Sequence, residues 1–209
     1  MRLLLTAAVA AASLAACSPS TAAPPAAAAG IQPRTFETVP IYPGLTKTGE
    51  EPTIEGGEVL MNDNETIPFV SGTKRSYTVA ATPEEVHNFY LSKLGGKIGY
   101  SSEDTHEFVK PNGSTPVILS LHEYDFEDRE NISGPTLRGA TKKATLTAAR
   151  KPLADGKWVS ESQFQWTIRD AKGDLRSFHV SIQDEGLAKN WSGYAPKTLV
   201  EITVNQFKH

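Results

Sequence analysis

Segments near the C-terminus alternate apolar and polar residues and are separated by turn or loop residues. They are residues 157–169, 175–183 and 198–207, and residues 154–156 and 170–174 carry the Asp and Gly that are typical of turns. Alternation with a period of two places every second side chain on one face of a strand. The pattern predicts antiparallel strands, and the side chains expected to face the core are Phe164, Trp166, Ile168, Phe178, Val180, Ile182, Val200, Ile202 and Val204.

Other segments with strand-like composition are expected to enlarge this sheet. They are residues 73–80, 107–110, 115–123 and 141–151. The Asn-Gly pair between the second and third of these tolerates the positive φ of a tight turn, so the two are predicted to form a hairpin. Its core-facing residues would be Val117, Leu119 and Leu121.

The beginning of the domain has weaker patterns. Residues 36–43 contain Pro40 and Pro43, which confine the segment to an extended edge position. Residues 45–68 are rich in Gly, Glu, Asn and Asp and are expected to form a long excursion over the surface.

The best helical signal covers residues 82–96. Thr82 is a suitable N-cap, Pro83 suits the first helical position, and Glu85 can complete a capping box with Thr82. An apolar stripe follows at helical spacing, and two glycines end the segment. The residues of the stripe, which we expect to be buried against a sheet, are Val86, Phe89, Tyr90 and Leu94.

These elements predict an α+β fold: an antiparallel β-meander of about six to eight strands, packed on one main helix, in a single domain over residues 35–209. One helix cannot cover so many strands. The sheet is therefore expected to be curled or partly closed, or to leave a face open. That uncovered area is the main reason to consider ligand binding.

Residues 1–16 have the features of a secretory signal peptide. Arg2 gives a positive n-region, residues 3–12 form an apolar run, and Ala15 and Ala16 are small enough for a signal peptidase. The run is too short to span a bilayer, which needs about 20 apolar residues. Export of the chain is therefore expected.

The signal ends in Leu14-Ala15-Ala16-Cys17, which resembles a bacterial lipobox. The resemblance implies cleavage before Cys17, attachment of a diacylglyceryl group to its sulfur, and usually a third acyl chain on the freed amine. Two or three long chains anchor a protein far more firmly than one myristoyl chain. Ser18, rather than Asp, follows the modified Cys, and in Gram-negative lipoproteins this favours sorting to the outer membrane. The expected location is the cell envelope, facing the periplasm if the host is Gram-negative.

Residues 18–34 are almost entirely Pro, Ala, Ser, Thr and Gly and have no periodic apolar face. Together with the lipidated Cys17 they are expected to form a disordered tether. At ~3.1 Å per residue such a Pro-rich segment could reach about 50 Å. Cys17 is also the only cysteine, so an internal disulfide is impossible and stability must come from the core.

A second resemblance involves Tyr42-Pro43-Gly44 and the helix motif Thr-Pro-Glu-Glu-Val-x-x-Phe-Tyr that starts at Thr82. Together they resemble a pattern seen in uncharacterised bacterial lipoproteins. The resemblance covers about a third of the chain. It implies no catalytic residues.

The sequence contains no motif for catalysis, metal binding or phosphate binding. The histidines His87, His106, His122 and His179 are scattered and lack metal-binding spacing, and the acidic run 122–128 lacks the spacing of a calcium loop. There is no nucleophile elbow or phosphate-binding loop. With 21 basic against 24 acidic residues and no basic cluster, a nucleic-acid partner is not expected. We therefore predict no catalytic residue, metal site or cofactor.

The candidate binding surface is the loop over residues 184–197, which carries Trp191 and Tyr194. Large aromatic side chains on a polar loop are typical of recognition surfaces. The alternative is a lid folded over the end of the core.

Three functions remain open on the sequence alone. The leading hypothesis is a non-enzymatic envelope lipoprotein, held in the membrane by acyl chains on Cys17, that binds another envelope component or assists assembly. The second is a carrier or sensor that holds a small apolar ligand in the curl of the sheet. The third is a hydrolase whose site is assembled only by the fold.

Overall fold

The computed structural model describes residues 32–53, 58–61, 65–98, 117–124, 139–186 and 194–208. Several predicted features lie outside the described residues. These are the signal peptide, Cys17, the tether up to residue 31, His106, the strand at residues 107–110, the acidic residues 125–128 and Trp191.

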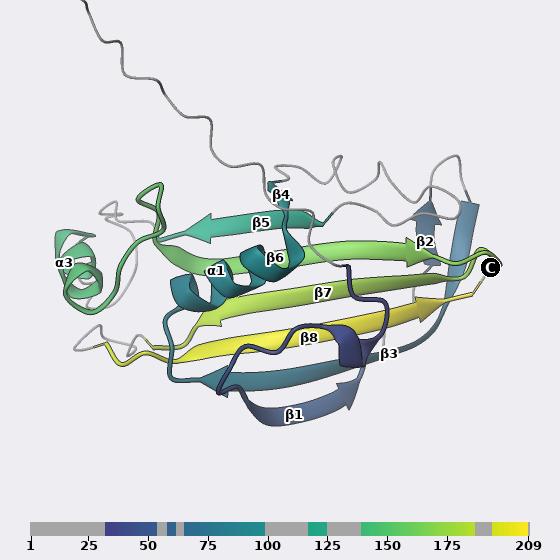
Figure 1. Cartoon of the computed structure of the whole chain (residues 1–209), viewed down its shortest axis with the longest axis horizontal. Coiled ribbons are helices and arrows are strands. Elements are labelled where there is room, and N and C mark those ends of the chain that lie inside the picture. Colours follow the sequence, from purple (N-terminus) through teal and green to yellow (C-terminus); the bar gives the residue numbers. More distant parts are fainter. Residues whose placement is uncertain are drawn as a thin grey trace, which may run out of the picture.

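The described strands form one open sheet (Figure 1). They are β1 (Thr46–Pro52), β2 (Glu58–Met61), β3 (Glu65–Val79), β4 (Lys97–Ile98), β5 (Ile118–Glu123), β6 (Val159–Arg169), β7 (Leu175–Asp184) and β8 (Thr198–Phe207). Their order is β1-β3-β8-β7-β6-β5-β4, and β2 pairs with β3. The pairs are antiparallel except β4 with β5, which is parallel. The predicted α+β class with a mainly antiparallel sheet is confirmed, and the sheet does not close.

The three C-terminal segments form the strands predicted from their alternation, β6, β7 and β8. Their register places Phe164 opposite Val180, and Val180 opposite Ile202. All three side chains are fully buried. Gly173, in the predicted turn between β6 and β7, has a φ of 90°, a conformation that glycine adopts without strain.

The helix α1 spans Pro83–Leu94 and begins as predicted. The Thr82 amide donates to Glu85 Oε2 at 2.8 Å, and the Glu85 amide donates to Thr82 Oγ1 at 3.4 Å. The helix contacts β6 and β7. Three side chains of its predicted apolar stripe, Val86, Tyr90 and Leu94, are buried, and Phe89 is half-buried.

The prediction of a strand at residues 141–151 is wrong, because the segment forms the helix α3 (Gly139–Ala149). The threonines suggested a strand, but Ala and Lys between them are good helix formers. A helical threonine can also satisfy its hydroxyl within the helix, as Thr147 Oγ1 does by donating to the Lys143 carbonyl at 2.7 Å. Among the described residues, a second α-helix is thus present in addition to the one predicted. In the described part of the chain, no helix is long and apolar enough to span a bilayer.

The predicted surface excursion at residues 45–68 is also wrong, since it contains β1, β2 and the start of β3. β1 is an edge strand, paired only with β3 among the described strands, and its residues are almost all exposed. A strand exposed on both faces has no alternation to detect in its sequence. The predicted extended segment at residues 36–43 instead starts with the short 3₁₀ helix η1 (Phe36–Thr38).

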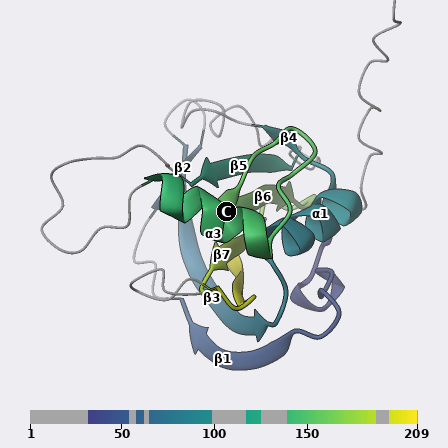
Figure 2. The ribbon, with the colours of Figure 1, turned by 90° about the vertical axis from the view of Figure 1, so that its left-hand side faces the viewer.

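The concave side of the sheet is covered by α1 together with the N-terminal residues 32–45. Figure 2 shows both on the same side of the curved sheet. Val39 belongs to the main core, and Phe36, Tyr42 and Leu45 pack against it. The Tyr42 ring meets the Phe89 ring of α1 edge to face, with centroids 5.3 Å apart. A segment whose regular structure is limited to the short helix η1 therefore completes the cover that α1 alone does not provide.

Candidate functional site

The sheet has two ends with different chemistry. At one end, β6 begins and β7 finishes near α3, whereas at the other end β6 finishes, β7 begins and β8 finishes (Figure 1). We call the first the cluster end and the second the groove end. The cluster end is defined by the buried charges of Glu84, Arg150 and Asp184. The groove end is defined by a cavity beside Arg34 and Arg176.

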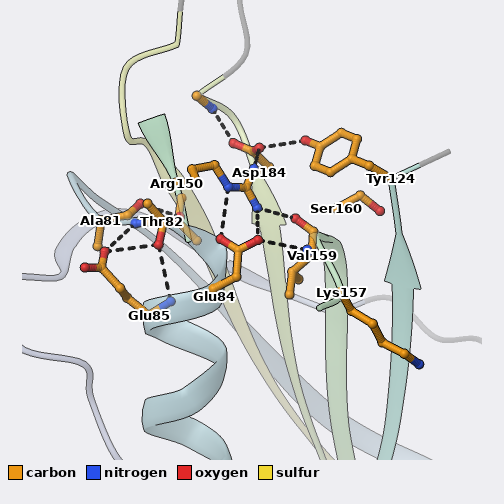
Figure 3. Close-up of polar contacts among 12 residues, drawn as sticks. Ala81, Thr82, Glu84, Glu85, Tyr124, Arg150, Lys157, Val159, Ser160 and Asp184 are labelled. Carbon is orange, nitrogen blue, oxygen red and sulfur yellow. Dashed lines mark hydrogen bonds and ion pairs between the residues drawn. The ribbon is translucent and has the colours of Figure 1, made fainter. Parts of the chain in front are cut away.

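Arg150, directly after α3, is the centre of the cluster end (Figure 3). Its guanidinium binds both carboxylate oxygens of Glu84, with Nε donating to Oε2 at 2.9 Å and Nη2 donating to Oε1. Nη1 donates to Asp184 Oδ2, and Nη2 also donates to the Val159 carbonyl at 2.7 Å. One side chain thereby joins α1, α3, β6 and β7.

The two carboxylates have further donors. Glu84 Oε1 accepts from the Val159 amide at 2.9 Å. Asp184 Oδ2 accepts from the Tyr124 hydroxyl at 2.6 Å, and its Oδ1 accepts from the Gly186 amide at 2.7 Å. The side chains of Arg150, Glu84 and Asp184 are only 0, 4 and 1% exposed. Because each carboxylate oxygen accepts at least one hydrogen bond, the cluster meets the condition for burying charge in a fold.

Two of the hydrogen-bond donors in the cluster, the Tyr124 hydroxyl and the Arg150 guanidinium, stay protonated near neutral pH. Burial and the hydrogen bond to Asp184 raise the pKa of the Tyr124 hydroxyl above its ordinary value. Burial alone would lower the pKa of Arg150, but hydrogen bonding and charge attraction to Glu84, with the charge of Asp184, raise it overall. Donors that hold their protons in this way suit a structural role better than proton transfer.

Tyr194, one of the two predicted binding residues, lies over this cluster and is half-buried. The Arg150 guanidinium carbon is 5.4 Å from the centroids of the Tyr194 and Tyr124 rings. The Ala195 amide donates to the Gly186 carbonyl at 3.2 Å, which brings together the two ends of the segment that carries Trp191. The cluster therefore supports the base of the predicted recognition loop. Trp191 itself is outside the described residues.

The groove end contains a cavity of about 370 Å³. The residues that matter for its chemistry are Arg34, Val70, Arg176, Phe207 and Lys208. A neighbouring cavity of about 300 Å³ is lined by Phe36 and shares Arg176 and Gln206 with the first. Both cavities lie between the N-terminal segment and the ends of β3, β7 and β8, and we refer to them together as the groove.

The N-terminal wall of the groove is attached firmly to the sheet. Trp166 Nε1 donates to the Pro33 carbonyl at 3.0 Å, and Arg176 Nη1 donates to the Arg34 carbonyl at 3.0 Å. The Arg75 guanidinium lies 3.9 Å from the centroid of the Phe36 ring. The chain therefore meets the domain at a defined point beside the groove.

The charges of the groove are accessible, unlike those of the cluster. Arg34 and Lys208 are exposed and make no ion pair with any described residue. Three carboxylates also line the groove, namely Asp170, Asp174 and Glu37. Asp170 Oδ1 accepts the amides of Lys172 and Asp174 at 2.8 and 3.1 Å. The structure thus places exposed cations where no sequence motif indicated a site.

The described histidines lie in different surroundings. His87 is buried on α1 with its ring centroid 5.5 Å from that of Phe164, and burial lowers its pKa to about 4. His122 is exposed on β5, and His179 is on β7. Within the described ranges, no three His, Cys, Asp or Glu side chains are grouped closely enough to hold a metal ion.

Comparison of the chain with known protein families, characterised proteins and solved structures gives no match. Function must therefore be inferred from the sequence and from the geometry of the two ends.

Proposed function

We propose that this chain is a membrane-anchored envelope lipoprotein whose domain is a non-enzymatic binding module. The observation that carries the proposal is the junction of tether and domain. Pro33 and Arg34, the last residues of the segment predicted as a disordered tether, are held by Trp166 and Arg176 at one end of the sheet. A fixed junction lets a lipid anchor at Cys17 present the rest of the domain to the envelope.

The proposed partner surface is the recognition loop at the cluster end, which contains Trp191 and Tyr194. Its base rests on the buried charges of Arg150 and Asp184. Loops held by a rigid scaffold are common places for recognition residues. The proposed location is the outer membrane, facing the periplasm, if the host is Gram-negative.

The carrier function has less support. It required space for an apolar ligand in the curl of the sheet, but side chains of α1 and of residues 36–45 pack there against the core. Tyr90 and Val86, both fully buried, lie in that region. An internal apolar ligand would have to displace them.

Lipidation can be tested by labelling cells with a fatty acid and isolating the full-length protein. We expect incorporation into the wild type and into Ser18→Ala, the matched control that keeps the thiol. Cys17→Ser should take up no label, since its hydroxyl is a much poorer nucleophile than a thiolate. Unchanged labelling of Cys17→Ser would refute the lipoprotein proposal.

Partner binding can be tested separately by crosslinking in cells that express the wild type, Trp191→Ala or Lys151→Ala. Lys151 is exposed near the same end of the sheet and serves as a matched surface control. We expect specific envelope proteins to be captured by the wild type and Lys151→Ala, and less by Trp191→Ala. Recovery of the same abundant background proteins by all three would count against a binding function.

A further inference from the structure

We infer that the groove end of the domain is its membrane-facing surface, and that its exposed cations bind the phosphates of phospholipid headgroups. The inference rests on the proposed membrane anchoring and adds to it the face that lies against the bilayer. It concerns the end of the sheet opposite the recognition loop.

The first argument is the place where the chain leaves the domain. Hydrogen bonds from Trp166 to Pro33 and from Arg176 to Arg34 hold this exit in the wall of the groove. An anchor at Cys17 would therefore be connected to the domain at its groove end. A tether that can reach about 50 Å would still allow other orientations, so surface chemistry has to select one of them.

The second argument is charge. Arg34, Arg176 and Lys208 come from three distant parts of the chain, yet they line one cavity. Arg34 and Lys208 are exposed, whereas Arg176 is half-buried and positioned by the Arg34 carbonyl. Guanidinium groups bind phosphate oxygens through paired hydrogen bonds, and cations near an anionic leaflet are attracted to it. The Arg176 guanidinium is occupied by the Arg34 carbonyl and by the side-chain oxygen of Gln206, so Arg34 and Lys208 are the exposed donors that can bind a phosphate.

The third argument is the apolar surface among these cations. Val70 in β3 is 55% exposed, which is unusual for a large apolar side chain in this domain, and it lines the same cavity as Phe207. Apolar residues flanked by Lys and Arg are typical of surfaces that rest at the boundary between headgroups and acyl chains. At the cluster end, by contrast, the charge of Arg150 is enclosed and paired.

The experiment uses the chain from Cys17 to His209, which contains every described residue. Its single thiol is coupled to a maleimide phospholipid in vesicles, and coupling is specific because Cys17 is the only cysteine. A photoreactive amino acid replaces Val70 in one protein and Asp155 in another. Asp155 is exposed in a turn at the cluster end and serves as the control position.

We expect position 70 to crosslink to lipid about fivefold more than position 155 in vesicles with about 30% anionic phospholipid. The double variant Arg34→Glu/Lys208→Glu should remove most of that difference. Lys151→Glu, which reverses an exposed charge at the cluster end, should leave it unchanged. Raised salt should weaken the lipid crosslinks, since exposed charges are screened.

Equal lipid crosslinking from both positions would overturn the inference. Lipid crosslinking from position 70 that is unchanged in the Arg34→Glu/Lys208→Glu variant would also overturn it. Crosslinks from position 70 to a second copy of the chain would overturn it in favour of self-association. Chemical coupling replaces cellular acylation, so these outcomes can be read even if the fatty-acid labelling fails. The proposed function and this inference can therefore fail independently.

Discussion

Arg150 and Arg176 lie at opposite ends of the same sheet, and their surroundings differ in most respects that matter for a charge. The Arg150 side chain is fully buried and binds two carboxylates. Arg176 is half-buried, donates to the Arg34 carbonyl and borders a cavity of about 370 Å³. The first charge connects four elements of the fold, whereas the second lies beside a cavity that the exposed cations Arg34 and Lys208 also line.

This difference separates two uses of charge in one small domain. A buried ion pair loses hydration, so it is tolerated only when it is fully hydrogen-bonded, and removing one partner is strongly destabilising. An exposed charge keeps its hydration and contributes little to stability. The cluster end should therefore be sensitive to mutation in unfolding experiments, and the groove end in binding experiments.

The largest expected effect on stability is that of Arg150→Met. It leaves the buried carboxylates of Glu84 and Asp184 without their cation, and we expect the free energy of unfolding to fall by about 3–5 kcal/mol. Urea denaturation followed by tryptophan fluorescence measures it. The neighbouring variant Lys151→Met should stay within about 0.5 kcal/mol of the wild type. If the free energy of unfolding fell by less than about 1 kcal/mol for Arg150→Met, the cluster would contribute little to holding α1, α3, β6 and β7 together.

The next effect is a pH dependence from His87, which lies one position after Val86 on the buried face of α1. Burial lowers its pKa from 6.5 to about 4, so the unfolded chain binds a proton more readily than the folded one between these values. Stability from neutral His87 is fully present above pH 6.5 and is lost as the pH falls towards 4. The loss is at most about 3 kcal/mol.

Urea denaturation of the wild type and of His87→Gln over this pH range isolates the contribution of His87 to the free energy of unfolding. The difference in unfolding free energy between them should shift against the wild type as the solution becomes more acidic. His122→Gln, which alters an exposed histidine on β5, is the control and should show a smaller change. A difference between wild type and His87→Gln that does not vary with pH would contradict the assignment.

A smaller effect is expected for Trp166→Phe at the groove end. The variant loses the hydrogen bond to the Pro33 carbonyl and part of the stacking on Phe178, for a cost of about 1–2 kcal/mol. Protease cleavage near residues 32–36 should become faster, because the junction is released. Trp158→Phe changes a buried tryptophan at the cluster end and should not accelerate that cleavage. Equal acceleration by both variants would indicate general destabilisation.

The smallest effect on stability is expected for Arg34→Glu and Lys208→Glu. Both side chains are exposed and lack a described ion-pair partner, so each change should stay within about 0.5 kcal/mol. Thermal or urea unfolding of the single variants provides the test. A fall in the free energy of unfolding above about 1 kcal/mol would show that these cations stabilise the fold. The two ends of the sheet would then differ less in how their charges contribute to stability.

Much of the fold could be predicted because its signals are local. The alternation in β6, β7 and β8 and the capping box of Thr82 and Glu85 each lie within one short segment. Local signals also misled: threonines in α3 suggested a strand, and the exposed strand β1 has no alternation. In α3 the helix propensity of Ala and Lys was decisive, and in β1 it was the exposed position at the edge of the sheet.

The two sites could not be predicted in the same way. Glu84 and Arg150 are 66 positions apart, and Arg150 and Asp184 are 34 apart. Each resembles an ordinary surface charge within its own segment. Arg34 and Lys208 likewise belong to segments near opposite ends of the chain, and nothing in either sequence indicates the other.

The amino-acid sequence by itself determined the capped helix, the three C-terminal strands and the presence of a single thiol, and it is the source of the export and lipidation hypotheses. Only the tertiary structure decided that residues 32–45 cover the concave face, that Arg150 is enclosed, and that Arg34, Arg176 and Lys208 share a cavity. Periodicity and capping depend on neighbours within a few residues. Whether a charge is buried or exposed depends on segments far away in the chain, because desolvation is set by whatever the fold packs around it.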